Sequence, residues 1–250
     1  MTKGGGMPRI TIAMIALNEE RAVEKVIRDI QASTAAPDCD ILVVDSSKDR
    51  TPEIAAALGA RVVRQFPPQG YGRAMLRALK EAAGEVVVTL DCDDTYPVDR
   101  IREIADMVLS GSTDLVNASR LASRPAAMPY PNYLANRLFA VVSWLLLGVK
   151  TTDVHSGMRA YRRTILDTVE FDPNGPALPV ELLLKPALLG YRISEVFIPY
   201  TERIGATTLN RWTSTVWTFR RILRLIPLRF SRLAPGGRPR GPQPFGKTPE

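Results

Sequence analysis

The stretch best equipped for chemistry is the acidic run Asp91-Cys92-Asp93-Asp94, which directly follows the apolar run Val86–Leu90. Asp91 and Asp93 are two residues apart, so in an extended chain their carboxylates project in the same direction. Such hard oxygen ligands suit Mg²⁺ or Mn²⁺, which keeps positions open for phosphate oxygens. The alternative is an acidic turn in solvent, with Asp94 capping a helix that begins near Pro97.

The apolar run indicates a central strand that is covered on both faces. In open α/β sheets, ligands bind at the carboxyl ends of the strands, where this acidic run stands. That position favours the metal interpretation of Asp91 and Asp93 over the helix cap.

The first 120 residues alternate between strand and helix patterns. The expected strands are Ile10–Leu17, Asp40–Asp45, Arg61–Arg64, Val86–Leu90 and Asp114–Ser119, and the expected helices are Glu19–Thr34, Thr51–Leu58, Gly72–Ala83 and Pro97–Ser110. This alternation predicts an α/β fold, with a mainly parallel, Rossmann-like sheet and helices on both faces. The chain has neither G-x-G-x-x-G after its first strand nor a P-loop, which disfavours those two nucleotide-binding classes.

The pattern changes after Ser119. We expect an apolar helix at Tyr133–Leu147, a strand at Gly157–Arg162, a helix at Val180–Leu189, a strand at Ser194–Ile198 and a helix at Trp212–Ile226. The last helix has an apolar face of Trp212, Val216, Phe219, Leu223 and Ile226, with Arg220, Arg221 and Arg224 off that face. Such a helix either lies in a membrane interface or packs on a core, and both remain open.

The composition describes one domain with appended segments. We expect a flexible start at 1–8, one domain at 9–210, an amphipathic basic helix at 211–233 and a disordered tail at 234–250. Two cysteines without C-x-x-C spacing indicate neither a disulfide framework nor a zinc site, and a reducing cytosolic compartment fits them. The start lacks a signal-peptide core, and the longest apolar run is too short to span a bilayer.

The net charge of +7 is concentrated near the end of the chain, because residues 201–250 hold ten Lys/Arg against two Asp/Glu. Such a basic segment favours a polyanionic partner, either a nucleic acid or an anionic membrane face, although a solubilising tail is the plain alternative. Because no nucleic-acid-binding module surrounds it, we expect no nucleic acid.

Several motifs in order resemble the family 2 glycosyltransferases of the GT-A fold. They are Asn18-Glu19, Asp45-Ser46-Ser47-Lys48-Asp49-Arg50-Thr51 and Asp91-Cys92-Asp93. Later motifs resemble the dolichyl-phosphate mannosyltransferase subgroup: Ala118-Ser119-Arg120, Asn136-Arg137, Asp153 through Tyr161, Glu181 through Lys185, and Arg203-Ile204-Gly205. The match covers about residues 9–210.

The resemblance implies transfer of a sugar, mannose first, from a nucleotide diphosphate donor such as GDP-mannose or a UDP-sugar to a polyprenyl phosphate, with inversion. Implied donor-binding residues are Leu17, Asn18, Glu19, Asp45, Asp91, Cys92, Asp93, Arg120 and Arg203; the metal ligands are Asp91 and Asp93, and the catalytic residues are Asp93, Arg120 and Asp153. Alternatives are a helix N-cap at Asn18, a charge at a helix start for Asp45, and a structural turn at Gln69–Arg73.

The acceptor decides whether the reaction needs a base. A phosphate is already ionised at neutral pH, so alignment and charge neutralisation are enough. A hydroxyl acceptor would need a general base, and Asp153 or His155 would be the candidates. The rival hypotheses are therefore a transferase that uses a UDP-sugar and a soluble hydroxyl acceptor, and a non-catalytic protein that binds nucleotide sugars.

The chain departs from the family pattern at four places, one of which is the Asp45 loop, where one residue is missing and two acids normally stand together. The proline that usually precedes Asn-Glu is absent, and its place is taken by Ile15-Ala16-Leu17. The usual Ser-Lys is replaced by Thr207-Thr208, and the amide that often faces the metal is replaced by Thr95. No transmembrane hairpins follow the domain, so the chain resembles the members that bind the cytoplasmic membrane surface peripherally.

Overall fold

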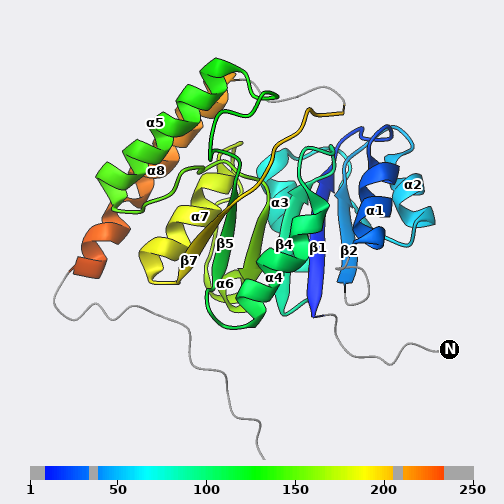
Figure 1. The fold of residues 1–250 in the computed structure, drawn as a ribbon, viewed down its shortest axis with the longest axis horizontal. Helices are drawn as coiled ribbons and strands as arrows, with labels where there is room; N and C mark the ends of the chain where they lie inside the picture. Colours follow the sequence, from blue (N-terminus) through cyan, green and yellow to red (C-terminus); the bar gives the residue numbers. More distant parts are fainter. Residues whose placement is uncertain (1–8, 34–38, 205–210, 234–250) are drawn as a thin grey trace, which may run out of the picture.

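The computed structural model describes residues 9–33, 39–204 and 211–233. Its centre is a seven-stranded sheet in the order β3-β2-β1-β4-β6-β5-β7 (Figure 1). The strands are β1 (Ile10–Ala16), β2 (Cys39–Asp45), β3 (Arg61–Arg64), β4 (Val86–Asp91), β5 (Leu115–Ser119), β6 (Arg159–Arg162) and β7 (Ile193–Phe197). Only β6 runs against its neighbours, so the predicted mainly parallel sheet is confirmed, with one antiparallel strand inserted between β4 and β5.

The strands are nearly continuous apolar runs because helices cover both faces of the sheet. In β2, Leu42 and Val44 face one apolar cluster and Val43 faces the other. The helices are α1 (Val23–Ala32), α2 (Thr51–Ala57), α3 (Tyr71–Glu81), α4 (Ile101–Leu109), α5 (Tyr130–Leu147), α6 (Arg163–Thr168), α7 (Leu178–Leu189) and α8 (Arg211–Leu233). Residues of α1, α2 and α4 pack in one cluster, and residues of α3, α5, α6, α7 and α8 pack in the other.

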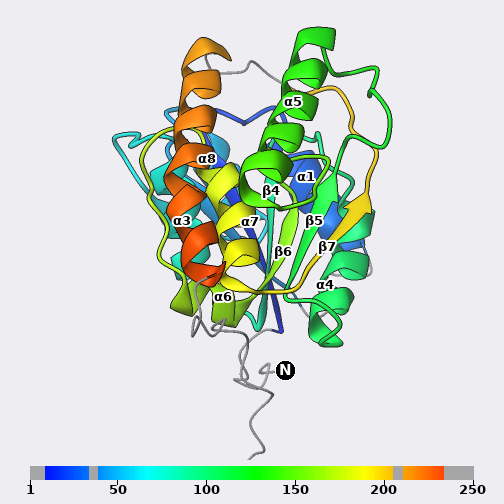
Figure 2. The same cartoon turned by 90° about the vertical axis from the view of Figure 1, so that its left-hand side faces the viewer.

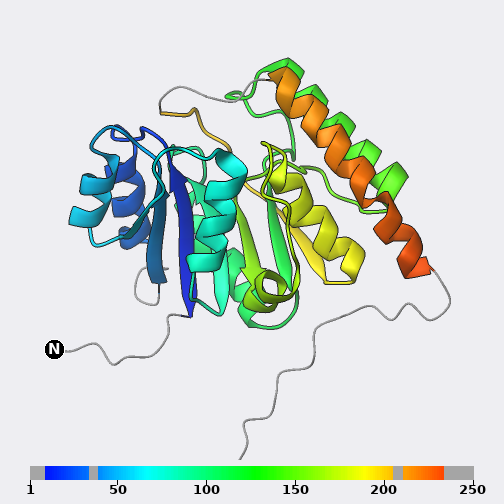
Figure 3. The same cartoon turned by 180° about the vertical axis from the view of Figure 1, so that it is seen from behind.

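Helices α5 and α8 form a pair beside the β5 and β7 end of the sheet, and α7 lies between this pair and the strands (Figures 1 and 3). Phe139 and Phe219 join the two helices edge to face, with ring centroids 5.1 Å apart. Arg229 of α8 donates to the carbonyl oxygens of Leu145 and Leu146 near the end of α5. These contacts hold α8 along the length of α5.

Most predicted elements are present, with shifted ends. Helix α1 begins at Val23 rather than Glu19, and the predicted helix at Pro97–Ser110 begins as a 3₁₀ turn, Val98–Arg100, before α4. Helix α8 runs to Leu233, and the six-residue α6 was not predicted. The expected flexible start and disordered tail, and Gly205 and Thr207-Thr208, lie outside the described residues.

The apolar face predicted for the last helix meets the core only in part, because of its five residues only Phe219 and Ile226 pack against the core cluster. Ile222 and Leu225 are buried against α7 and the sheet, and Arg221, predicted to lie on a polar face, is 2% exposed. Trp212, at 82% exposed, and Leu223, at 52%, point away from the core. Acids, rather than solvent, determine the position of Arg221, because its guanidinium pairs with the buried Glu181 and the partly exposed Asp172.

None of the described helices combines enough length with enough apolar character to span a membrane.

Candidate active site

The acidic run lies where parallel strands bring their carboxyl ends to one edge of the sheet. In β1, Ile15 is paired with Asp91 of β4, and Ala16 with Asp45 of β2. Gly157 approaches this edge closely, since a Cβ there would lie 2.8 Å from Asp91 Oδ2. Only glycine allows that approach, and its N–H donates to the Tyr96 hydroxyl at 2.7 Å.

Asp93 is buried and has partners for both oxygens. Its Oδ1 accepts hydrogen bonds from the hydroxyl of Thr95 at 2.6 Å and from the backbone N–H of Thr95 at 3.2 Å. Its Oδ2 lies 3.1 Å from a guanidinium nitrogen of Arg203, and Arg203 also pairs with Glu19. Arg203, implied by the resemblance to bind donor phosphate, is therefore a counter-ion of two carboxylates in this structure.

Negative charge nevertheless exceeds positive charge at this edge. Burial, together with the charge of Asp93, raises the pKa of Asp91 to about 7. Burial raises the pKa of Glu19 as well, against the lowering effect of Arg203. Carboxylates held this close favour a bound cation, because it stabilises their charged forms.

Asp91 and Asp93 therefore fit the predicted Mg²⁺ or Mn²⁺ by charge and oxygen chemistry. Within residues 9–33, 39–204 and 211–233 no group of three His, Cys, Asp or Glu side chains is arranged to hold a metal. Two carboxylates are enough for an ion that takes its other ligands from water and phosphate. When bound, such an ion would supply charge neutralisation for a departing nucleotide diphosphate.

Asp45 is fully buried at the end of β2. Its Oδ2 accepts the backbone N–H of Ser47 at 3.1 Å and pairs with Arg64. Its Oδ1 is buried and has no hydrogen-bond partner in the described structure. A buried carboxylate oxygen without a donor suits a ligand N–H, as the predicted contact with a nucleotide base requires, whereas the acid in the first turn of the helix that follows is Glu53.

Asn18 joins the loops that follow β1 and β2. Its backbone has φ of 59°, its N–H donates to Ser47 Oγ at 2.7 Å, and its Oδ1 accepts the Lys48 N–H at 2.9 Å. The N-cap alternative is wrong, because α1 is capped at Ala22. The neighbouring Leu17 is 37% exposed at this edge.

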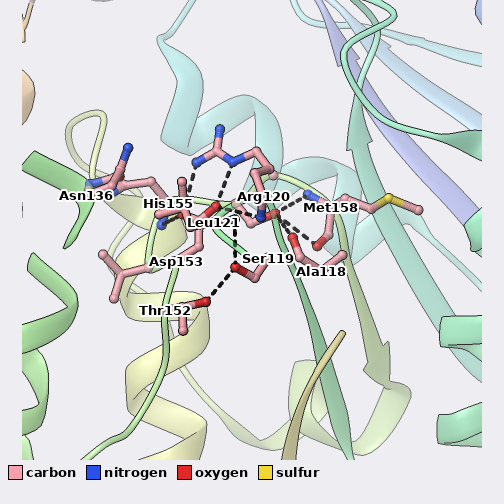
Figure 4. Close-up of polar contacts among 12 residues, drawn as sticks. Ala118, Ser119, Arg120, Leu121, Asn136, Thr152, Asp153, His155 and Met158 are labelled. Atoms are coloured by element: carbon pink, nitrogen blue, oxygen red, sulfur yellow. Dashed lines mark hydrogen bonds and ion pairs between the residues drawn. The ribbon is translucent and has the colours of Figure 1, made fainter. Parts of the chain in front are cut away.

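Arg120 and Asp153 form a buried bidentate ion pair (Figure 4). Nε of Arg120 lies 2.7 Å from Oδ2 of Asp153, and Nη2 lies 3.0 Å from Oδ1. The guanidinium carbon also stands 5.1 Å from the ring centroid of Tyr200. Burial alone would raise the pKa of Asp153, but Arg120 outweighs it and holds that pKa below its ordinary value, so Asp153 is a weak base.

The surroundings of His155 make it a poor general acid or base. Burial lowers its pKa to about 4, its Nε2 lies 2.8 Å from Thr218 Oγ1 of α8, and its ring packs on Phe139 of α5. The neutral imidazole ties this loop to the α5 and α8 pair. Figure 4 shows it beside Asp153, whose Oδ1 accepts the His155 backbone N–H at 3.0 Å.

Two residues of the acidic run have different roles from those expected. Asp94 does not cap the helix after Pro97, because no side chain caps that turn and Asp94 Oδ1 instead accepts Lys25 Nζ at 2.8 Å. The side chain of Cys92, implied to bind the donor, is 1% exposed within the apolar cluster that contains Leu90. Only its backbone is left to meet a ligand.

The sequence pattern did not predict the two tyrosines near Asp91, Tyr96 and Tyr71. Tyr96 hydrogen-bonds Gly157, and burial, followed by the nearby charge of Asp91, raises the pKa of Tyr71 well above its ordinary value. Tyr71 stands inside the glycine-flanked turn at Gln69–Arg73, which was a usable signal. The sequence pattern does not connect Lys25 with the acidic run, because Asp94 lies 69 residues further on, although Lys25 also pairs locally with Asp29.

Comparison with known proteins decides the family. The model of Glycosyl transferase family 2 matches residues 11–170. The chain belongs to this glycosyltransferase family. A dolichyl-phosphate hexose transferase of Haloferax volcanii is 42% identical over 201 residues, which cover 80% of this chain and 86% of that protein.

Two further relatives extend the comparison. A dolichol-phosphate mannosyltransferase of Pyrococcus furiosus is 28% identical, and the match covers 79% of this chain and 57% of that protein. Glucosyl-3-phosphoglycerate synthase of Mycobacterium tuberculosis, solved with Mn²⁺, UDP-glucose and phosphoglyceric acid, superposes with a TM-score of 0.70 at 25% identity, over 88% of this chain and 80% of that one. The protein is thus a family 2 glycosyltransferase with the GT-A fold that its motifs predicted.

Proposed function

We propose that this glycosyltransferase moves a hexose, with mannose the first candidate, from a nucleotide diphosphate donor to a polyprenyl phosphate, with inversion and with Mg²⁺ or Mn²⁺. The observation that carries the proposal is the state of the two candidate bases. Asp153 is committed to Arg120 in a bidentate pair, and burial lowers the pKa of His155 to about 4. A site in which neither candidate base readily takes a proton suits an acceptor that is already ionised.

The names of two relatives support this acceptor. The Haloferax volcanii and Pyrococcus furiosus proteins act on dolichyl or dolichol phosphate by name. The Mycobacterium tuberculosis structure, in contrast, holds phosphoglyceric acid, a soluble acceptor, and keeps the hydroxyl-acceptor hypothesis as the second candidate. Its bound Mn²⁺ and UDP-glucose support a metal-dependent donor site here.

The outer face of the α5 and α8 pair supports binding to a membrane surface. It carries exposed large apolar side chains: Tyr130, Leu134, Leu138, Val141, Trp144 and Leu145 on α5, and Trp212, Val216, Leu223 and Phe230 on α8. Arg220 and Arg224 are exposed on α8 as well. Apolar side chains beside basic ones suit the cytoplasmic leaflet, which holds anionic lipids, so we place the protein peripherally on that face.

A cavity beside this helix pair provides a place for the lipid end of the acceptor. Its volume is about 440 Å³, and its lining includes Arg137, Trp144, Lys150 and Thr152. Thr152 Oγ1 lies 2.6 Å from Ser119 Oγ, next to Arg120 (Figure 4). The cavity therefore extends from the exposed Trp144 of α5 to Thr152, which hydrogen-bonds the residue before Arg120.

The test is a partition assay. The purified full chain with Mn²⁺ is given radiolabelled GDP-mannose or UDP-glucose, together with polyprenyl phosphate in liposomes or with 3-phosphoglycerate. Label that enters the organic phase only when the polyprenyl phosphate is present supports the proposal. Label that stays in a water-soluble product while lipid phosphate is present overturns it and favours the second candidate.

A further inference from the structure

The loop at 172–175 links α8 to the turn that begins α3. Gly72 stands in the first turn of α3, and a Cβ there would lie 2.3 Å from the backbone oxygen of Pro173. A Cβ on Gly175 would lie 2.5 Å from the indole ring of Trp217 on α8. The loop therefore contacts the start of α3 on one side and α8 on the other, with no room for a methyl group at either contact.

Buried ion pairs fasten α8 to the same loop. Arg221 is 2% exposed, and its guanidinium pairs with Glu181 of α7 and lies 3.1 Å from Asp172. Its other terminal nitrogen donates to the carbonyl oxygen of Asn174 at 2.5 Å, and Asp172 Oδ1 accepts the Asn174 N–H at 3.0 Å. The Arg221 guanidinium thus contacts both Asp172 and Asn174 of the loop. It has no role in the proposed transfer reaction.

The other end of this contact chain is at the donor edge of the sheet. The end of β3 lies at this edge, because Arg64 is paired with Asp45 of β2, and the segment that follows β3 leads from it into α3, which begins at Tyr71, directly before Gly72. The charge of Asp91 also acts on the Tyr71 phenol, whose pKa burial raises. Gly70, with φ of 91°, lets the chain turn into α3 at this point. Figures 2 and 3 show the loop before α7 between the start of α3 and α8.

We propose that Arg221 is a positioning residue, which acts through the 172–175 loop to hold Gly72 and Tyr71 in the geometry that binds the nucleotide diphosphate donor. The inference rests on the proposed donor site, but it does not depend on which acceptor is used. It gives α8 a second role, since the helix that presents exposed apolar residues also supports the donor edge.

The test compares nucleotide binding among variants of the full chain. The dissociation constants of UDP and of GDP with Mn²⁺ are measured by calorimetry for the wild type, Arg221→Met, Arg221→Lys and Asp172→Ala. We expect a rise of at least threefold for Arg221→Met with the tighter nucleotide, partial recovery for Arg221→Lys, and a smaller rise for Asp172→Ala. Asp172→Ala removes a half-exposed partner and keeps the test open if Arg221→Met does not fold.

The matched control is Arg162→Met. Arg162 is another buried arginine paired with an acid, Asp114, but at the opposite end of the sheet from the acidic run. Its loss should lower the melting temperature and leave nucleotide binding unchanged. Equal binding by wild type and Arg221→Met, or equal weakening by Arg162→Met, overturns the positioning role, whereas failure of the lipid-transfer assay with these shifts intact overturns only the proposed acceptor.

Discussion

At the scale of single residues, neighbouring carboxylates with the same chemistry have different environments. Asp93 is buried with Arg203 and Thr95, whereas Asp94 pairs with Lys25 at the surface of α1. Asp91 is close enough to Asp93 for that charge, after burial, to raise its pKa to about 7. Position at the strand end, and not the number of acids, therefore separates the candidate metal ligands from an ion pair.

Substituting Asp93→Asn should lower the transfer rate by a factor of about 10² or more, because it removes one charge from the candidate metal pair. Asp94→Asn is the matched control, since it makes the same change one residue further on, and Asn tolerates the positive φ of 63° at this position. Steady-state rates with saturating Mn²⁺ provide the measurement. Similar rates for the two variants would contradict the metal assignment.

Asp91→Asn should stabilise the metal-free protein at alkaline pH. The folded pKa of Asp91 is about 7 against an ordinary 3.8, so the folded state keeps a proton that the unfolded chain releases. This stability contribution is complete below about pH 4 and is lost as the pH rises through 7. Melting curves in EDTA should show the variant about 4 kcal/mol more stable at pH 8, with the difference vanishing near pH 4.

At the scale of elements, α8 combines two faces that the sequence pattern did not separate. The buried face holds Ile222 and Leu225 with Arg221, and the outer face holds Trp212 and Leu223. Deleting the helix would expose the core as well as remove the outer face. A test of membrane binding therefore needs substitutions on the outer face alone.

Trp212→Glu combined with Leu223→Glu should weaken sedimentation with anionic liposomes about tenfold or more, because each change removes an apolar contact and adds a repelled charge. Phe66→Glu is the control, since Phe66 is 54% exposed but follows β3, away from the helix pair. Both proteins should keep the wild-type melting temperature. Unchanged sedimentation of the double variant would leave α5 as the candidate contact.

At the scale of the whole molecule, the candidate site is assembled from segments far apart in the chain. Glu19 and Arg203 are 184 residues apart, and Arg120 meets Asp153 across 33. The acidic run, Asn18 and Asp45 come together because β1, β2 and β4 are parallel neighbours. Ligand binding should therefore stabilise the entire fold.

UDP or GDP with Mn²⁺ should raise the melting temperature, because a ligand bound only by the folded state stabilises it by about 2.7 kcal/mol at 100 times its dissociation constant. The effect should need both nucleotide and metal. Thermal-shift curves with the nucleotide alone, Mn²⁺ alone and both together provide the measurement. AMP with Mn²⁺ is the control, since it lacks the pyrophosphate, and an equal shift with AMP would contradict a diphosphate site.

Apolar periodicity and strand-end position are local properties, so the sequence was enough to predict a mainly parallel sheet and the edge that holds the acidic run. The sequence also predicted the family, because short motifs occur along it in the order typical of that family. The ends of α1 and the inward Cys92 side chain were settled by packing against other elements.

The partners of the charged residues became known only from the folded structure. Arg203 pairs with Asp93 and Glu19, and Arg120 pairs with Asp153. Arg221 lies between α7 and the 172–175 loop. An ion pair depends on which distant segments fold together and on how much water they exclude. A local sequence pattern contains no information on either point.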